Sequence, residues 1–272
     1  MRIPLGRKIL FYFLLALFAA VIFAPAVIAF LMSFMTNQEI FAGKLFPHSF
    51  SWDNYARLFE RFPIIHYLTN SLVVSLLIMA GQLILSSLAA YAFAFLSFKG
   101  RDAIFFLFIA TMMIPFETSI IPNFQTIRNL GLLDTYAGMT LPFFATAFGT
   151  FLLRQNFKQI PRELKEASEI AGMGDFKFFL TVALPMARTG LVTLGLYAFL
   201  TSWNMYLWPL LATTNERVRT VQIGLRQLQS QEQVNEWGMI MAGAVIVVVP
   251  TLILLFLGQK RLQRGLTEGA FK

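Results

Sequence analysis

The side chains able to form covalent or metal bonds are few in this chain. It has no cysteine, and its two histidines, His48 and His66, are well separated in the sequence. Disulfide, thiolate and iron–sulfur chemistry are therefore excluded, and so is a zinc site built on cysteine. We expect neither a metal site nor a catalytic group in this protein.

Nucleotide hydrolysis is also excluded as an activity of the chain itself. A phosphate-binding loop needs the pattern G-x-x-x-x-G-K-[ST], whose backbone surrounds the phosphates. The only Gly-Lys pair is Gly43-Lys44, and Leu45 follows it. The chain is therefore predicted to be no enzyme and to hold no cofactor. Energy for any work must come from a partner or from an ion gradient.

Four neighbouring residues have the types that sugar sites use, aromatic platforms beside a polar side chain. They are Trp203, Asn204, Tyr206 and Trp208. Because the aromatic belt of a membrane protein contains the same types without any ligand, both interpretations stay open. Glu117 is the only acid within an apolar stretch. It is either part of a solute pathway or an acid at the membrane interface or in an ion pair.

The elements that must position these residues belong to a membrane protein. Hydrophobic residues make up 57% of the chain and charged residues 13%, against about 25% charged in soluble domains. Such a surface favours lipid as its solvent. The net charge of +8 does not indicate nucleic acid, because the charges gather at the ends of apolar segments and form no basic stripe.

Apolar segments long enough to cross a bilayer occur about six times, since a crossing helix needs about 20 apolar residues. The chain is therefore predicted to be an all-α, polytopic membrane protein that forms one domain over residues 1–272. The predicted spans are residues 9–35, 70–96, 103–122, 135–153, 187–212 and 237–258.

Orientation follows from the lysines and arginines, which favour the cytoplasmic side of a membrane. Most of them fall on one side if both termini lie inside, so we predict an N-in, C-in topology. The longest polar stretch on that inner side is then the loop at 154–186, between spans four and five. A loop of that length usually has structure of its own or a function.

This inner loop is predicted to form two short helices joined by a glycine turn. Pro161 suits the first turn of a helix, and Gly172 and Gly174 suit its end. A second helix is predicted from Phe176 to about Leu184, just before Pro185. The first helix is amphipathic, with a small and apolar face and a charged face on the other side. The small and apolar face is Ile160, Leu164, Ala167 and Ala171.

The charged face of this helix fits a protein partner, although an interfacial helix that only connects two spans has the same pattern. Glu166-Ala167-Ser168 is followed after three residues by Gly172, and after nine more by Val182-Ala183-Leu184-Pro185. This arrangement resembles the EAA loop of the membrane subunits of binding-protein-dependent ABC importers. Ser168 and Ala171 depart from the usual alanine and aspartate, but neither departure moves the glycine.

The resemblance extends over nearly the whole chain and points to the carbohydrate-uptake branch, to permeases of the maltose type. Glycerol-phosphate importers share the same features, so glycerol 3-phosphate or a glycerophosphodiester is an alternative to a sugar or oligosaccharide. The segments that carry the resemblance are Phe46-Pro47, Asn54-Tyr55, Asn70-Ser71, Phe98 to Arg101, Gly131 to Tyr136, Trp203 to Pro209 and Arg264 to Lys272.

The resemblance implies a permease of the bacterial inner membrane that works beside several partners. These are a second homologous permease, two cytoplasmic ATPase subunits that bind ATP and Mg²⁺, and an extracytoplasmic solute-binding protein, with lipid around the spans. The residues implied in ATPase coupling are Glu163, Glu166, Ala167, Ser168, Gly172, Gly174 and Pro185. The tail residues implied near the ATPases are Gly265, Thr267, Gly269 and Lys272.

An ion-coupled secondary transporter is the alternative of a different class. It would need acids or broken helices within the membrane in two related halves. Glu117 is the one residue in the sequence that supports it. The two classes differ in whether a soluble ATPase accompanies the chain.

Overall fold

The computed structural model describes residues 5–231 and 236–267, and this part of the chain contains helices and no strand. It divides into two compact units. Unit 1 comprises the residues up to His66 together with Gly224–Pro250, and unit 2 comprises Tyr67–Ile223 with the residues from Thr251 onward. The predicted all-α fold is confirmed. Each unit is described by itself.

Unit 1 is built on one long apolar helix and two short ones. α14 (Val221–Gln231) begins in unit 2, α15 (Trp237–Thr267) ends in unit 2, and α4 (Ile64–Phe95) begins in unit 1 and continues in unit 2. The helices are α1 (Leu5–Met32), α2 (Asn37–Phe41), α3 (Asp53–Arg61), α14 (Val221–Gln231) and α15 (Trp237–Thr267). The short helix α2 begins with a capping box, in which Thr36 and Glu39 satisfy each other's backbone N–H groups.

The apolar side chains of α1 are exposed along most of its length. The most apolar 18-residue stretch of this helix has no residue buried within the described chain. A helix that is apolar all round is stable only in an apolar environment, because exposure of such a surface to water is unfavourable. Pro25 lies inside it without ending it, as membrane helices tolerate.

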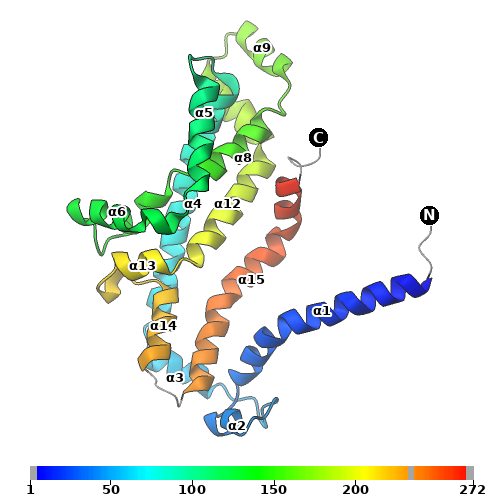
Figure 1. Cartoon of the computed structure of the whole chain (residues 1–272), viewed down its shortest axis with the longest axis vertical. Helices are drawn as coiled ribbons and strands as arrows, with labels where there is room; N and C mark the ends of the chain where they lie inside the picture. The colour runs from blue at the N-terminus through cyan, green and yellow to red at the C-terminus, as the bar shows by residue number, and fades with distance from the viewer. Residues whose placement is uncertain (1–4, 232–235, 268–272) are drawn as a thin grey trace. The chain divides into compact units, whose positions relative to one another are not determined.

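Unit 2 contains most of the helices. They are α4 (Ile64–Phe95), α5 (Arg101–Ala110), η1 (Thr111–Met113), α6 (Phe116–Asn129), α7 (Tyr136–Thr140), η2 (Leu141–Phe143), α8 (Ala147–Phe157), α9 (Arg162–Ile170), α10 (Asp175–Phe178), η3 (Phe179–Ala183), α11 (Leu184–Met186), α12 (Arg188–Trp203), α13 (Leu207–Ala212) and η4 (Glu216–Val218). Within this unit, α9 lies at one end, beyond the ends of α5 and α8, and α13 lies towards the other (Figure 1).

Within the described residues, three single helices are long and apolar enough to cross a membrane. The number rises to six if each bent helix pair is counted as one span. The single helices are α1, α4 and α15, which lie over three of the predicted spans. The bent pairs are Arg101–Met113 with Phe116–Asn129, Tyr136–Phe143 with Ala147–Phe157, and Asp175–Met186 with Arg188–Trp203. The expectation of about six crossing elements is therefore met, although half of them are not straight helices.

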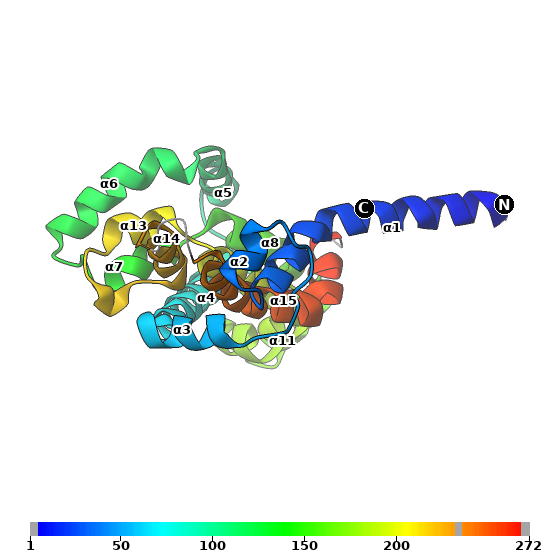
Figure 2. The ribbon, with the colours of Figure 1, turned by 90° about the horizontal axis from the view of Figure 1, so that it is seen from below.

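The segment predicted as the third span, 103–122, breaks at Ile114-Pro115. Ile114 is extended, with φ −89° and ψ 113°, because a residue before proline avoids helical angles. α6 then leaves at 99° to α5. Figure 2 shows α6 lengthwise beyond the end of α5. Glu117 consequently lies in the first turn of α6 and not within a straight membrane helix.

Unit 2 packs around α4, which has a hydrophobic cluster near each end. One cluster surrounds Ala90 and Tyr91, with residues of α8, η3 and α12. The other surrounds Val74 and Ile78, with residues of α6, α7 and α13. Between them α8 approaches α4 closely at Gly149, where any side chain would collide with Ser86. Close helix contact at small residues is typical of membrane proteins.

Candidate functional site

The loop at 154–186 is the best-defined candidate site, and its geometry begins with the ends of α9. Pro161 precedes the helix with an extended ψ of 135°. At the other end Met173 N–H donates to Ser168 O at 2.8 Å, and Gly172 N–H donates to Glu169 O at 2.9 Å. These two bonds form a Schellman motif, which requires the left-handed backbone that Gly172 adopts at φ 70°.

The buried side of α9 is not its apolar face. Ser168 is the buried residue of this helix, and Lys165 lies beside it with 13% of its side chain exposed. Leu164 and Ala167, predicted to share a face of the helix, are both exposed. The apolar stem of Lys165 can be covered while its charge is paired, so this residue can lie on the buried side.

Lys165 joins α9 to the next helix. Its ammonium lies 2.6 Å from Asp175 Oδ1 and 3.1 Å from Glu169 Oε1. It also lies 5.1 Å from the centre of the Phe178 ring, within range of a cation–π contact. Burial opposes the charge of Lys165, but the hydrogen bonds to Asp175 and Glu169 prevail and raise its pKa. The same Lys165 contact lowers the pKa of Asp175.

The second helix of the loop continues through Pro185, where the sequence predicted an end. Asp175–Phe178 is α-helical, Phe179–Ala183 forms a π-helical turn, and Leu184–Met186 is α-helical again. Proline removes a hydrogen-bond donor and crowds the carbonyl four residues earlier. A wider π turn relieves that crowding, so the helix continues to the bend of 78° before α12.

The outward face of α9 offers charge and apolar surface together. Glu163, Glu166 and Ala167 are exposed, and Ile170 is 89% exposed. Ile170 was not singled out from the sequence, although an isoleucine in a polar helix end is a recognisable signal. Such a mixture of exposed acids, a small residue and an apolar side chain suits a protein partner.

A hollow of about 500 Å³ lies beside α9, against the ends of α4, α5 and α8. Glu166 and Glu169 line it together with basic residues. Burial, and then the positive charge of Arg154, lower the pKa of Lys158. The basic residues of the lining are Arg101, Lys158, Arg162 and Lys165.

Two residues that anchor this loop were missed by the sequence analysis. The Tyr91 hydroxyl of α4 donates to Asp175 O at 3.0 Å. Arg154, which is buried at the end of α8, donates to Phe93 O at 3.2 Å and lies over the Phe105 ring at 3.8 Å. No spacing in the sequence reveals these contacts, because the partners are far apart along the chain.

The candidate pathway residues are not brought together by unit 2. Trp208 is fully buried and donates to Gly138 O at 3.2 Å. Trp203 is 3% exposed and stacks on Phe199. Asn204 and Glu117 are exposed, and Asn204 donates to Leu200 O of its own helix. The two tryptophans thus serve as packing residues in this structure, while Tyr206 is partly exposed.

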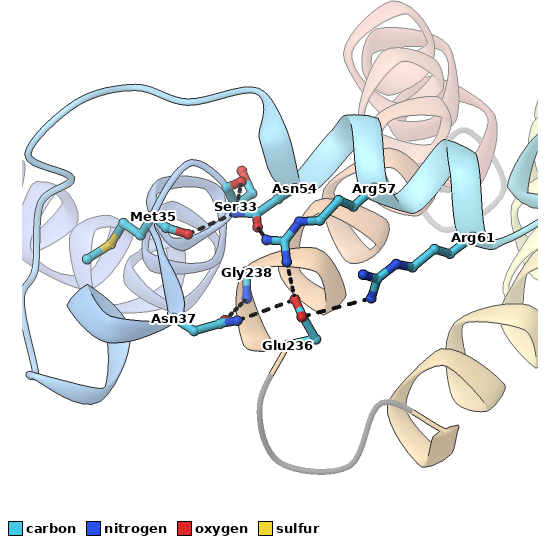
Figure 3. Close-up of polar contacts among 8 residues, drawn as sticks. All are labelled: Ser33, Met35, Asn37, Asn54, Arg57, Arg61, Glu236 and Gly238. Atoms are coloured by element: carbon cyan, nitrogen blue, oxygen red, sulfur yellow. Dashed lines mark hydrogen bonds and ion pairs between the residues drawn. The ribbon is translucent and has the colours of Figure 1, made fainter.

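A second polar centre lies in unit 1, around Glu236 (Figure 3). Glu236 lies 2.7 Å from Arg57 Nη1 and 4.0 Å from Arg61 Nη1, and accepts a hydrogen bond from Asn37 Nδ2 at 3.3 Å. Asn54 donates to Ser33 O and Met35 O, both at 2.9 Å. This network ties the end of α1 to α3 and to the start of α15.

Two further expectations concern the C-terminal tail and metal binding. Gly265 and Thr267 lie in the last turns of α15, whereas Gly269 and Lys272 lie outside the described residues. Among residues 5–231 and 236–267, no three histidine, aspartate or glutamate side chains are grouped to hold a metal ion.

Known proteins resemble this chain in sequence and in fold. The sn-glycerol-3-phosphate transport system permease protein UgpE of Yersinia pestis bv. Antiqua (strain Antiqua) is 33% identical, over 97% of each chain. The protein of the same name from Agrobacterium fabrum (strain C58 / ATCC 33970) is 35% identical, also over 97% of each chain.

Two solved structures share the fold. A chain of a bacterial ABC transporter involved in the import of the acidic polysaccharide alginate matches with a TM-score of 0.87 and 24% identity. The match covers 96% of this chain and 99% of that one. A chain from a bacterial alginate ABC transporter in complex with alginate pentasaccharide-bound periplasmic protein matches with a TM-score of 0.68, 16% identity and 93% coverage of each chain.

Residues 82–268 match the family model of the binding-protein-dependent transport system inner membrane component. This range includes the whole loop at 154–186, with its Schellman turn and its exposed acids. The expectation of a binding-protein-dependent permease of the carbohydrate type is confirmed at the level of the family. The chain therefore belongs to the family of inner membrane components of binding-protein-dependent transport systems.

Proposed function

We propose that this permease forms half of the solute pathway of an ATP-driven importer and that α9 is the helix to which an ATPase subunit binds. The observation that carries the proposal is the arrangement of α9. Lys165 holds the buried side of the helix and Gly172 forms its terminal turn. Glu163, Glu166 and Ile170 are left exposed. A rigid element with an exposed mixed face suits the transfer of force from a partner.

Energy enters through the partner in this proposal. The sequence has no phosphate-binding loop, so ATP and Mg²⁺ belong to the ATPase subunits. Glu166 supplies a negative charge to a basic patch on that subunit, and Ala167 permits close approach. The inner location of the loop, with both termini in the cytoplasm of a bacterium, follows from the positive-inside rule.

A second, homologous permease completes the pathway. The apolar side chains of α1 find no cover within the described chain, so lipid and this second permease share that surface in our proposal. A solute-binding protein delivers the solute on the opposite side of the membrane. We also propose that residues of the tail, 264–272, contribute to ATPase binding.

Glycerol 3-phosphate, or a glycerophosphodiester, is the first solute class to test, because curated relatives at 33% and 35% identity are named for it. A sugar or oligosaccharide is the second class, because the loop and span motifs resemble sugar permeases. The alginate transporter supports the fold and no particular solute, since its chain is 24% identical.

Affinity purification of the tagged chain from its native membrane tests the proposal. We expect a nucleotide-hydrolysing subunit and a second permease in the purified complex, and ATP-dependent uptake of one of the two solute classes after reconstitution. Active uptake by a complex without any nucleotide-hydrolysing subunit would refute the proposal. An ion gradient that drives such uptake would establish the secondary-transporter alternative.

A further inference from the structure

We infer that α4 is the rod that carries movement between the ATPase-binding loop and the loops on the opposite side of unit 2, with Tyr91 and Asn70 as its two attachment points. The inference rests on the proposed function, because it assigns a route for the coupling that the proposed function requires.

The attachment at one end is the Tyr91 hydroxyl. It donates to Asp175 O at 3.0 Å and also lies 3.3 Å from Asp175 Oδ1. Asp175 is in turn paired with Lys165 of α9 at 2.6 Å. Around these bonds the Tyr91 ring contacts the Phe95 and Phe179 rings, each at 5.1 Å between ring centres. A displacement of α9 therefore reaches α4 through one polar chain and its aromatic surroundings.

The attachment at the other end is Asn70, which is 1% exposed. Its amide donates to Arg217 O at 3.1 Å and Arg219 O at 2.9 Å, and its Oδ1 accepts from the Tyr136 hydroxyl at 2.6 Å. The neighbouring Ser71 accepts from Val221 N–H at 2.8 Å. Both loops that follow the bent spans, at 130–136 and 213–221, are thus held to one turn of α4.

The helix between the two points is continuous. Tyr91 follows Asn70 by 21 residues without a break in α4, which corresponds to about 31 Å along a helix axis. That length is close to the roughly 30 Å hydrocarbon thickness of a bilayer. The neighbouring crossing elements α5–α6, α7–α8 and α10–α12 are bent by 99°, 52° and 78°. The unbroken α4 is therefore the stiffest route across unit 2.

Stiffness matters because a helix cannot shorten without breaking backbone hydrogen bonds, whereas a bent pair can hinge at its break. A push on Asp175 is thus transmitted to Asn70 as a displacement of the whole rod. Since Asn70 holds two loops at once, both loops respond together. Partners on the two sides can then both bias the position of this one helix, as coupling between sites requires.

The test uses three matched removals of a tyrosine hydroxyl in the assembled, reconstituted importer. Tyr91→Phe removes the bond to Asp175, and Tyr136→Phe removes the bond to Asn70. Tyr197→Phe is the control, because Tyr197 lies on α12 and shows no hydroxyl hydrogen bond among the described residues. The measured quantity is the ratio of ATP hydrolysis with and without the solute-loaded binding protein. The amount of co-purified ATPase subunit is measured beside it.

We expect Tyr91→Phe and Tyr136→Phe each to lower this ratio about two- to tenfold, the range for the loss of one hydrogen bond. The co-purified ATPase should stay at the level of the unchanged protein and of Tyr197→Phe. The double variant should lower the ratio no further than the single variant with the larger loss. Two interruptions of one route act in series, so their effects do not multiply.

An unchanged ratio in Tyr91→Phe, an equal loss in Tyr197→Phe, or a double variant whose loss is the product of the two single losses would overturn the inference. The proposed function fails in a different way, if the unchanged protein brings no ATPase with it. The inference about α4 is therefore refuted only if the ATPase is coupled to transport and this coupling does not depend on the Tyr91 and Tyr136 hydroxyls.

Discussion

Lys165 Nζ of α9 lies 2.6 Å from Asp175 Oδ1, so the first residue of α10 holds the exposed helix of the inner loop by its buried side. Asp175 is itself held to α4, because its backbone carbonyl accepts a hydrogen bond from the Tyr91 hydroxyl. The loop is therefore a fixed part of unit 2 and not a loose connection. A loop fixed in this way can transmit force, whereas a loose one would absorb it.

The ion pair makes the order of the loop depend on pH. The pKa of Asp175 is lowered in the folded protein, so its contribution is present above the ordinary pKa of 3.8 and is lost as pH falls through the lowered pKa. The pKa of Lys165 is raised, so its contribution is present below 10.5 and is lost as pH rises through the raised pKa. Hydrogen exchange of the α9 amides should show both losses. In Asp175→Asn the acid-side loss should be absent, and its persistence would contradict this account.

The glycine turn provides a matched pair of substitutions. Gly172→Ala forces a side chain into φ 70°, which costs about 1 kcal/mol. Gly174→Ala is the control, since Gly174 has φ −69° and both sites have open space for a methyl group. Amide exchange in α9 should quicken about fivefold in Gly172→Ala alone. Equal rates in the two variants would show that the left-handed turn does not hold the helix.

Charge reversal at the exposed face separates docking from folding. Glu166→Lys should release the ATPase subunit, because it opposes a basic partner surface, while thermal unfolding in detergent stays unchanged at an exposed site. Glu60→Lys is the control, since Glu60 is an exposed acid on α3 in unit 1. The amount of co-purified ATPase is the readout. Normal amounts with Glu166→Lys would count against α9 as the binding helix.

The network of unit 1 should contribute to stability through Glu236. Glu236→Gln keeps the shape of the side chain but removes the charge that faces Arg57 at 2.7 Å. We expect a loss of about 1 kcal/mol, seen as a lower midpoint of thermal unfolding and faster amide exchange at 33–41. Glu60→Gln should leave both values unchanged. If the two variants behave alike, the network is not a stabilising contact.

The crossing elements could be predicted because apolar length is a local property. α1, α4 and α15 are long apolar helices, and the sequence reveals them directly. Pro115 could have been read as a break, since proline ends a helix, but the direction of α6 after it is set by its contacts with residues distant in the chain. The burial of Trp208 against Gly138 likewise depends on partners 70 residues apart.

The inner loop was predicted in outline, but the side of α9 that is buried was not predicted. Gly172 could be predicted because a left-handed turn strongly prefers glycine. The inward position of Lys165 could not, because periodicity places charges outward and takes no account of a partner such as Asp175. Tyr91 and Arg154 gave no signal, since their partners lie on other helices.

Cross-linking from one cysteine on α9 tests the central claim most directly. The chain has no cysteine of its own, so Ala167→Cys places a single reactive group on the exposed face. In native membranes we predict a cross-link from this position to a nucleotide-hydrolysing subunit on the cytoplasmic side. A cysteine at position 167 that reacts with an impermeant reagent from outside intact cells, and cross-links to no such subunit, would contradict the account.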